Sequence, residues 1–147
     1  MCWLAPAPAE TLLRIATLAP EGSSWMRLFH RLSGKLEKRT AGSLRLKMYG
    51  GGVAGDGRHM VRKMRQGELD GAAVTPIGLG LIQSEVLLFE VPFLITRQEE
   101  LEHVRDKLDG ELRKMFEERG YVLLAWGDIG QVYLFTGTPL EKRSDLE

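Results

Sequence analysis

The sequence predicts an α/β fold: a mainly parallel sheet with helices on both faces. Short apolar runs typical of buried strands alternate with longer segments whose apolar residues recur at helical spacing. Glycine, proline and small polar residues separate these segments and mark turns. Hydrophobic residues make up 44% of the 147 residues and charged residues 27%, which is ordinary for a globular domain. Strands that alternate with helices favour parallel pairing through right-handed crossovers.

The first three elements form a strand, a helix and a second strand. Leu12–Leu18 is a short apolar run that predicts a buried strand. Ser23 is positioned to cap the following helix, which ends at Gly42. Leu44–Tyr49 alternates apolar and basic residues, so a second strand follows. One face of the helix carries its apolar residues: Trp25, Leu28, Phe29, Leu32 and Leu36.

Three consecutive glycines, Gly50–Gly52, break the second strand. Asp56 is expected to cap a helix that places Met60, Val61 and Met64 on one face. Gly67 ends or distorts this helix, and Leu69–Thr75 predicts a third strand.

The remaining chain carries one long helix between less regular segments. From Pro76 to Ile95 we expect a short helix or irregular turn, then an extended segment around Pro92. Thr96 and Glu99 form a capping box, and Gly120 ends the helix that follows. Its inward residues are Leu101, Val104, Leu108, Leu112, Met115 and Phe116. Tyr121–Trp126 and Gln131–Thr136 are predicted as strands. We expect burial of Leu13, Ile15, Leu46, Val74, Leu123 and Leu124 in the sheet, and also of Trp25 and Leu108.

Composition excludes several classes of function. Twenty basic residues balance twenty acidic ones, which argues against a nucleic-acid partner. The single cysteine, Cys2, can form neither a disulfide framework nor a cysteine-based zinc site. The longest apolar stretch, from Leu79 to Ile95, is interrupted by polar residues and is no membrane span.

The motifs of common enzymes and of cofactor sites are missing. Gly50–Gly57 lacks the Lys-Ser/Thr of a phosphate-binding loop. His30, His59 and His103 do not have metal-ligand spacing, so each is interpreted as solvent-facing and no metal is expected. No G-x-S-x-G elbow occurs, and the Ser23-Ser24 pair is interpreted as a helix start. We therefore expect a protein that is not an enzyme and needs no cofactor.

One edge of the predicted sheet is suited to ligand binding. In open parallel sheets, ligands bind at the carboxyl ends of the strands. Here those ends carry the loops Ala19–Ser24, Gly50–Asp56 and Thr75–Gly78. Two of these loops lead into helix N-termini, whose free backbone N–H groups favour an anion. The residues alone thus indicate a site for a small anion.

Four segments resemble the periplasmic solute-binding proteins of TRAP transporters, the DctP-like family. They are TLAPEGSSW, YGGGVAGDGRHMVRKMRQGELDGAAVT, LFEVPFLI and WGDIGQVYLF, in the family's order and spacing from about Leu13 to Glu147. Two departures are Gly50, where proline is common, and Ala54, where leucine is usual.

This resemblance implies a two-lobed receptor that binds a small organic acid and delivers it to a membrane permease. By the same resemblance, the first-lobe contacts come from the loop Ala19–Ser24, which includes Glu21, and from Asp56 and Thr75. Gln131, on the strand that crosses to the second lobe, is implied to face the cleft. The resemblance also implies a periplasmic location. The candidate site residues are Ala19, Glu21, Ser24, Asp56, Thr75 and Gln131.

The residues of the N-terminal segment and the resemblance together divide the chain into three parts. Residues 1–10 are either a disordered tail or a signal-peptide remnant, residues 11–127 form the ligand-binding first lobe, and residues 128–147 begin an incomplete second lobe. Without the second lobe's wall and arginine, we expect binding weaker than about millimolar. Two alternatives remain: a standalone α/β module that forms homodimers through the exposed crossover strand, and a small α/β enzyme.

Overall fold

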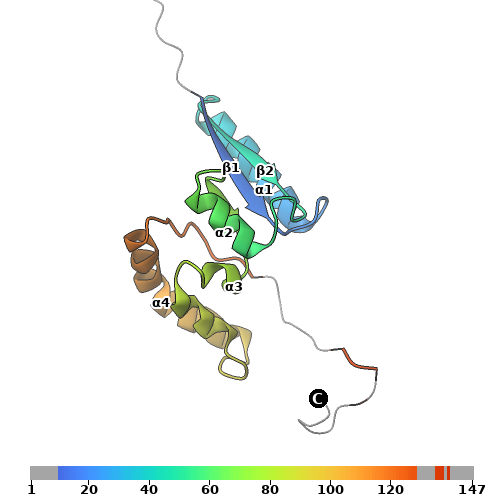
Figure 1. The fold of residues 1–147 in the computed structure, drawn as a ribbon, viewed down its shortest axis with the longest axis vertical. Helices are drawn as coiled ribbons and strands as arrows, with labels where there is room; N and C mark the ends of the chain where they lie inside the picture. The colour runs from blue at the N-terminus through green and yellow to red at the C-terminus, as the bar shows by residue number, and fades with distance from the viewer. Residues whose placement is uncertain (1–9, 129–134, 138, 140–147) are drawn as a thin grey trace, which may run out of the picture.

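A computed structural model describes residues 10–128, 135–137 and 139. The order of elements begins β-α-β-α-β and ends on a long helix (Figure 1). In chain order they are β1 (Thr11–Thr17), α1 (Ser24–Arg39), β2 (Leu44–Tyr49), α2 (Gly57–Arg65), β3 (Gly71–Ala73), α3 (Pro76–Leu79), the 3-10 helix η1 (Ser84–Glu90) and α4 (Gln98–Glu118).

The sheet of the described chain has three parallel strands in the order β2-β1-β3. Leu13 is paired with Leu46, and Ala16 is paired with both Tyr49 and Ala72. β1 lies in the centre. The first connection contains α1 and leads to β2 on one side of β1, and the second contains α2 and leads from β2 to β3 on the other side. The predicted parallel α/β sheet is confirmed.

Helices cover the sheet on both faces, with α1 behind β1 and β2 and α2 in front of the strands in Figure 1. The core beneath α2 is formed by Met60 together with Ala16 of the central strand, Ala54 and Leu69. Met60 and Ala16 are both fully buried. Burial of one apolar stripe explains the predicted alternation of Met60, Val61 and Met64 with charged residues along this helix.

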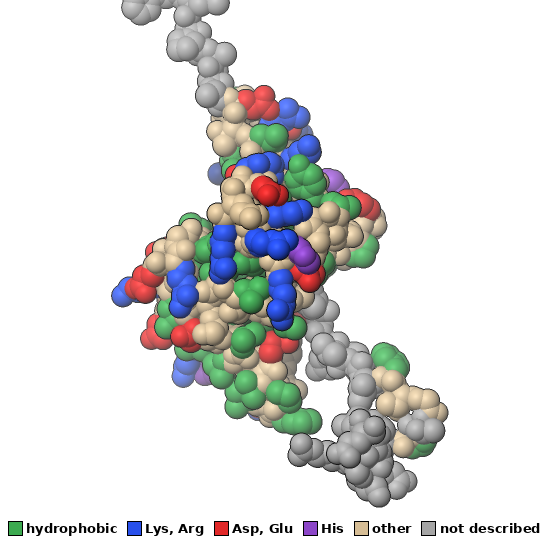
Figure 2. All heavy atoms as spheres, in the orientation of Figure 1, with side chains coloured by type: hydrophobic (Ala, Val, Ile, Leu, Met, Phe, Trp, Pro, Cys, Tyr) green, Lys and Arg blue, Asp and Glu red, His purple; other side chains and the backbone are tan. Residues whose placement is uncertain are grey.

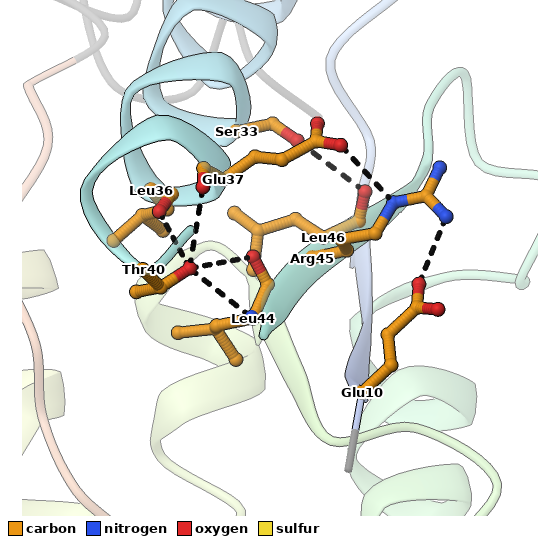
Figure 3. Close-up of polar contacts among 8 residues, drawn as sticks. All are labelled: Glu10, Ser33, Leu36, Glu37, Thr40, Leu44, Arg45 and Leu46. Carbon is orange, nitrogen blue, oxygen red and sulfur yellow. Dashed lines mark hydrogen bonds and ion pairs between the residues drawn. The ribbon is translucent and has the colours of Figure 1, made fainter. Parts of the chain in front are cut away.

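Polar contacts fix the turn between α1 and β2 (Figure 3). The Thr40 hydroxyl donates to the Leu36 carbonyl at 2.8 Å and accepts from the Leu44 backbone N–H at 3.1 Å. Arg45 of β2 then lies between two carboxylates, 2.8 Å from Glu10 and 3.6 Å from Glu37. One hydroxyl thus joins the last turn of the helix to the first residue of the strand.

A second core lies beyond α2, between that helix and α4. It consists of Val61, Ile82, Val86, Leu112, Phe116 and Leu123. Residues 121–128 run along α4, where the Trp126 Nε1 donates to Asp109 at 2.7 Å. Arg113 pairs with the same carboxylate at 2.7 Å and also donates to the Leu123 carbonyl.

The predicted strand Tyr121–Trp126 is wrong, because residues 121–128 have no regular secondary structure. Leu123 is buried against α4, but Leu124 is 82% exposed. The segment follows the helix instead of joining the sheet, so only alternate side chains find an apolar surface. Leu13, Ile15 and Leu46 of the sheet are half-buried, as are Val74 just after β3, Trp25 of α1 and Leu108 of α4.

Two further expectations need adjustment near α4. The capping box is formed by Arg97 and Glu100 instead of Thr96 and Glu99, since Arg97 is the N-cap and its backbone N–H donates to the Glu100 carboxylate. Between Pro76 and Ile95 the expected short helix is present as α3, and the 3-10 helix η1 follows it. No helix in the described part of the chain has the length and apolar character that crossing a membrane would need.

Candidate functional site

The carboxyl edge of the sheet gathers the described members of the predicted site. Because all three strands are parallel, the loops that follow them leave at the same edge. Ala19, Glu21 and Ser24 follow β1, Asp56 follows β2, and Thr75 follows β3. Gln131, the sixth predicted residue, lies outside the described residues.

Backbone contacts join these loops into one surface. The Gly51 N–H donates to the Ala19 carbonyl at 2.8 Å, and the Gly52 N–H donates to the Thr17 carbonyl at 3.2 Å. A Cβ on Gly57, the first residue of α2, would come within 3.3 Å of the Gly78 Cα in α3. The starts of α2 and α3 therefore pack backbone to backbone, which only small residues allow.

The first turn of α1 supplies hydrogen-bond donors to this edge. Ser23 is the N-cap, and its Oγ accepts from the Met26 N–H at 3.2 Å. Among the described residues, no acceptor is paired with the backbone N–H of Ser24 or Trp25. The exposed Ser24 hydroxyl lies beside these two groups. An anion bound here would also be stabilised by the positive end of the helix dipole.

The first turn of α2 supplies an acceptor instead. Asp56 is the N-cap, and its Oδ1 accepts from the His59 backbone N–H at 2.9 Å and from His59 Nδ1 at 2.8 Å. The hydrogen bond from the His59 backbone, followed by that from its side chain, lowers the pKa of Asp56 below its usual value. An ionised carboxylate can only accept hydrogen bonds, so Asp56 requires a donor on any ligand that it contacts.

The other two loops contribute smaller groups. Glu21 is exposed, and its carboxylate lies 3.8 Å from the His30 Nε2. Thr75 occupies the N-cap position of α3, but its hydroxyl makes no capping hydrogen bond. The Ala19 backbone N–H donates to the Thr17 hydroxyl at 3.2 Å. The Thr75 hydroxyl is thus the less constrained of the two threonine hydroxyls.

Sequence reasoning missed a contact between this edge and the end of the described chain. Gly127 packs directly against the Trp25 ring in the first turn of α1. Trp126 beside it contacts the Phe89 ring at a centroid distance of 5.7 Å. The only signal in the sequence was the glycine itself, which permits a close approach.

Two cavities of the described chain are shallow and contain none of the predicted site residues. One, of about 210 Å³, is lined by Tyr49, Val53, Ala54, Lys63, Glu68 and Leu69. The other, of about 110 Å³, lies at the start of α4 and includes Arg97, Gln98 and Asp128. At the carboxyl edge, Glu21, Ser24 and Asp56 are exposed to solvent.

The arrangement of strands, loops and helix N-termini is that of one lobe of a solute-binding protein. A match to the family DctP, described as bacterial extracellular solute-binding protein, family 7, covers residues 15–147. The chain belongs to this family. The family consists of extracellular binding proteins, and the solved relatives are periplasmic binding proteins.

Two relatives come from bacterial genomes. An uncharacterized protein of Haemophilus influenzae is 31% identical over 130 residues, covering 85% of this chain and 38% of its own length. The uncharacterized protein YiiZ of Salmonella typhimurium is 25% identical over 143 residues, covering 93% of this chain and 42% of its own. The chain therefore spans less than half the length of the curated relatives that it matches.

Solved structures share the fold. A TRAP periplasmic solute-binding protein from Citrobacter koseri, with bound D-glucuronate, has a TM-score of 0.80 and 26% identity over 92% of this chain and 46% of its own. One from Ralstonia eutropha, with bound (S)-2-acetolactate, has a TM-score of 0.70 and 26% identity over 79% of this chain and 38% of its own. The ligands in these two relatives are small organic acids.

Proposed function

We propose that this chain forms the first lobe of a periplasmic receptor that binds a small organic acid and delivers it to a TRAP-type permease. The observation that carries the proposal is that the N-termini of α1 and α2, one offering donors and the other an acceptor, both lie at the carboxyl edge of one parallel sheet. The first turn of α1 offers N–H donors that have no acceptor among the described residues, and the first turn of α2 offers the Asp56 carboxylate. As a binding lobe, the chain carries out no reaction.

The chemistry of this edge selects among organic acids. The ligand's carboxylate is placed at Ser24 and Trp25 of α1, because the helix dipole and the free N–H groups attract negative charge there. Near Asp56 the ligand must present a hydroxyl, because two ionised carboxylates in contact repel each other. Hydroxy acids are therefore favoured over acids of the same length without hydroxyls. The Thr75 hydroxyl serves as a further partner.

Titration of the isotope-labelled 147-residue chain, followed by NMR, tests this proposal. D-glucuronate is expected to shift the amide signals of Ser24, Trp25 and Asp56, with a dissociation constant above about 1 mM because the edge is open to water. Hexanoate, which has the same number of carbons but no hydroxyls, is expected to bind more weakly. Equal shifts with both acids, or shifts confined to α4, would contradict the site.

A matched pair of threonine variants separates the site from the rest of the sheet. Thr75→Ala at the carboxyl edge is expected to weaken binding of D-glucuronate. Thr11→Ala, at the exposed amino end of β1, is expected to leave binding unchanged. If the two variants behave alike, the carboxyl edge is not where the acid binds.

The homodimer and enzyme alternatives gain no support. The predicted strand Gln131–Thr136, through which a standalone module would form homodimers, lies outside the described residues except for its last two positions. Several carboxylates in the described residues have a lowered pKa because they accept hydrogen bonds at a helix cap or from nearby basic groups and hydroxyls. Asp109, which accepts from Arg113, is one example. A pKa that is lowered by such neighbours is typical of structural interactions and does not by itself indicate a catalytic carboxylate.

A further inference from the structure

Charge is distributed very unevenly along this neutral chain. Residues 1–65 contain twelve of the twenty basic residues and only four of the twenty acidic ones. Within this basic half, α2 is the extreme case, because its nine residues include four Arg or Lys and no Asp or Glu. The chain has no net charge overall, but α2 is strongly cationic.

The cations of α2 share its outer side. Arg58, Arg62 and Arg65 are exposed and recur at intervals of four and three residues, so they form one stripe about 10 Å long. Lys63 is half-buried on the flank of this stripe, and His59 lies beside it. In Figure 2 the basic side chains gather on the face that this helix presents to the viewer. We call Arg58, Arg62, Lys63 and Arg65 the cationic face.

Most of the cationic face is unpaired. Among the described residues, the side chains of Arg58, Arg62 and Lys63 make no hydrogen bond or ion pair, and Arg65 donates only to the Leu81 carbonyl at 2.7 Å. Some basic side chains elsewhere are used within the fold, as in the Arg14 pair with Asp70 at 2.8 Å, whereas α2 has three cations without such a partner in the described chain within nine residues. The cationic face is thus available to an external partner.

Helix stability accounts for only part of this charge. Lys63, Arg62 and Arg65 lie in the last turn, where positive charge complements the helix dipole. Arg58 lies in the first turn, where positive charge opposes that dipole. Its presence there costs stability without a compensating contact within the described chain, which favours a role in binding.

A cavity borders the cationic face. Lys63 lines the cavity of about 210 Å³ together with Tyr49, Val53, Ala54, Glu68 and Leu69, so a hollow with apolar walls and one charged group of each sign adjoins the cations. Val53 at its rim is 74% exposed. Such a hollow accommodates an apolar side chain of a partner whose acidic groups are paired with the arginines.

We propose that the cationic face of α2 docks an acidic polypeptide surface carrying an apolar side chain beside its carboxylates. Three of the four cations are arginine, whose planar guanidinium binds carboxylates through paired hydrogen bonds. The adjoining hollow favours a polypeptide over a phosphate-rich surface. The acidic character of the partner is inferred from the residues of the cationic face and of the hollow. Only the further step of identifying the partner as a permease subunit would rest on the proposed receptor function.

Fluorescence anisotropy with a labelled peptide tests this proposal. The probe is a helical peptide of about 20 residues with glutamates at positions i, i+4 and i+7 and a leucine beside them. The 147-residue chain is expected to bind it, with an affinity that falls as salt rises from about 50 to about 200 mM. A scrambled peptide of the same composition is expected to bind more weakly. Equal binding of both peptides would overturn the proposal.

Charge-matched variants locate the binding surface. Arg58→Gln with Arg62→Gln is expected to weaken peptide binding at least about fivefold. Arg31→Gln with Lys35→Gln removes the same charge at the same spacing from the exposed side of α1, on the other face of the sheet, and should have little effect. Equal losses in both double variants would show that only net charge matters and would overturn the proposal.

Competition experiments distinguish an acidic polypeptide from other anionic partners. Vesicles of anionic phospholipid and a short DNA duplex are expected not to compete with the peptide at comparable charge concentration. Stronger binding to either, lost in the Arg58→Gln/Arg62→Gln variant, would assign the face to phosphate groups and overturn the proposal. Circular dichroism of that variant is expected to show an unchanged fold and an unchanged or higher melting temperature, because the unfavourable charge of Arg58 is removed.

Discussion

The backbone of Gly127 lies against the indole ring of Trp25. A Cβ on Gly127 would overlap the ring's Cη2 and lie 3.2 Å from both Cζ2 and Cζ3. The end of the described chain therefore returns from α4 to the first turn of α1, where the candidate site begins. The contact links the second core to the carboxyl edge of the sheet.

Gly127→Ala is expected to destabilise the chain by about 1–3 kcal/mol, because the added methyl group must displace the Trp25 ring or the backbone. Urea unfolding measures this change. Gly110→Ala is the control: Gly110 lies inside α4 with open space at its Cβ position, so the variant is expected to gain up to about 1 kcal/mol. Equal effects of the two variants would disprove the contact with Trp25.

Ser23 and Ser24 are neighbours with different tasks. Ser23→Ala removes the N-cap of α1 and is expected to cost about 1 kcal/mol of stability. Ser24→Ala changes an exposed residue beyond the cap and is expected to stay within about 0.5 kcal/mol of the parent chain. Thermal unfolding compares the two variants. A larger loss in Ser24→Ala would mean that Ser24 is the cap.

The fold was accessible from the sequence where local signals agreed. The caps Ser23 and Asp56, the apolar stripe of α2 and the alternation of β2 each identify an element by themselves. The parallel sheet then places Ser24, Asp56 and Thr75 at one edge without further information. This much follows from short-range periodicity and from the geometry common to all parallel sheets.

Features that depend on a distant partner were not accessible. An apolar run such as Tyr121–Trp126 becomes a strand only where another strand offers hydrogen bonds, and here the run follows α4 instead. The contact of Gly127 with Trp25 depends on that same path. That Arg58 and Arg62 make no ion pair within the described residues could be recognised only after the carboxylates of those residues had been placed.

Acidification is expected to weaken the cap of α2. Hydrogen bonds from His59 lower the pKa of Asp56, so the ionised cap stabilises the fold above the unfolded value near 3.8 and loses this contribution as pH falls through the lower folded value. Asp56→Asn cannot lose a charge on acidification. The difference in melting temperature between parent and variant is therefore expected to shrink from pH 5 to pH 3. A constant difference would show that the charge of Asp56 does not stabilise α2.

Leu123 and Leu124 give the sharpest test of the path along α4. Leu123 is 8% exposed within the second core, whereas Leu124 is 82% exposed. Leu123→Ala is expected to cost about 2–5 kcal/mol, because it leaves a cavity beside Phe116 and Leu112. Leu124→Ala removes an exposed side chain and is expected to change stability by less than about 0.5 kcal/mol. If Tyr121–Trp126 were a strand buried on both faces, the two variants would cost similar amounts, so urea unfolding of the pair decides between the two arrangements.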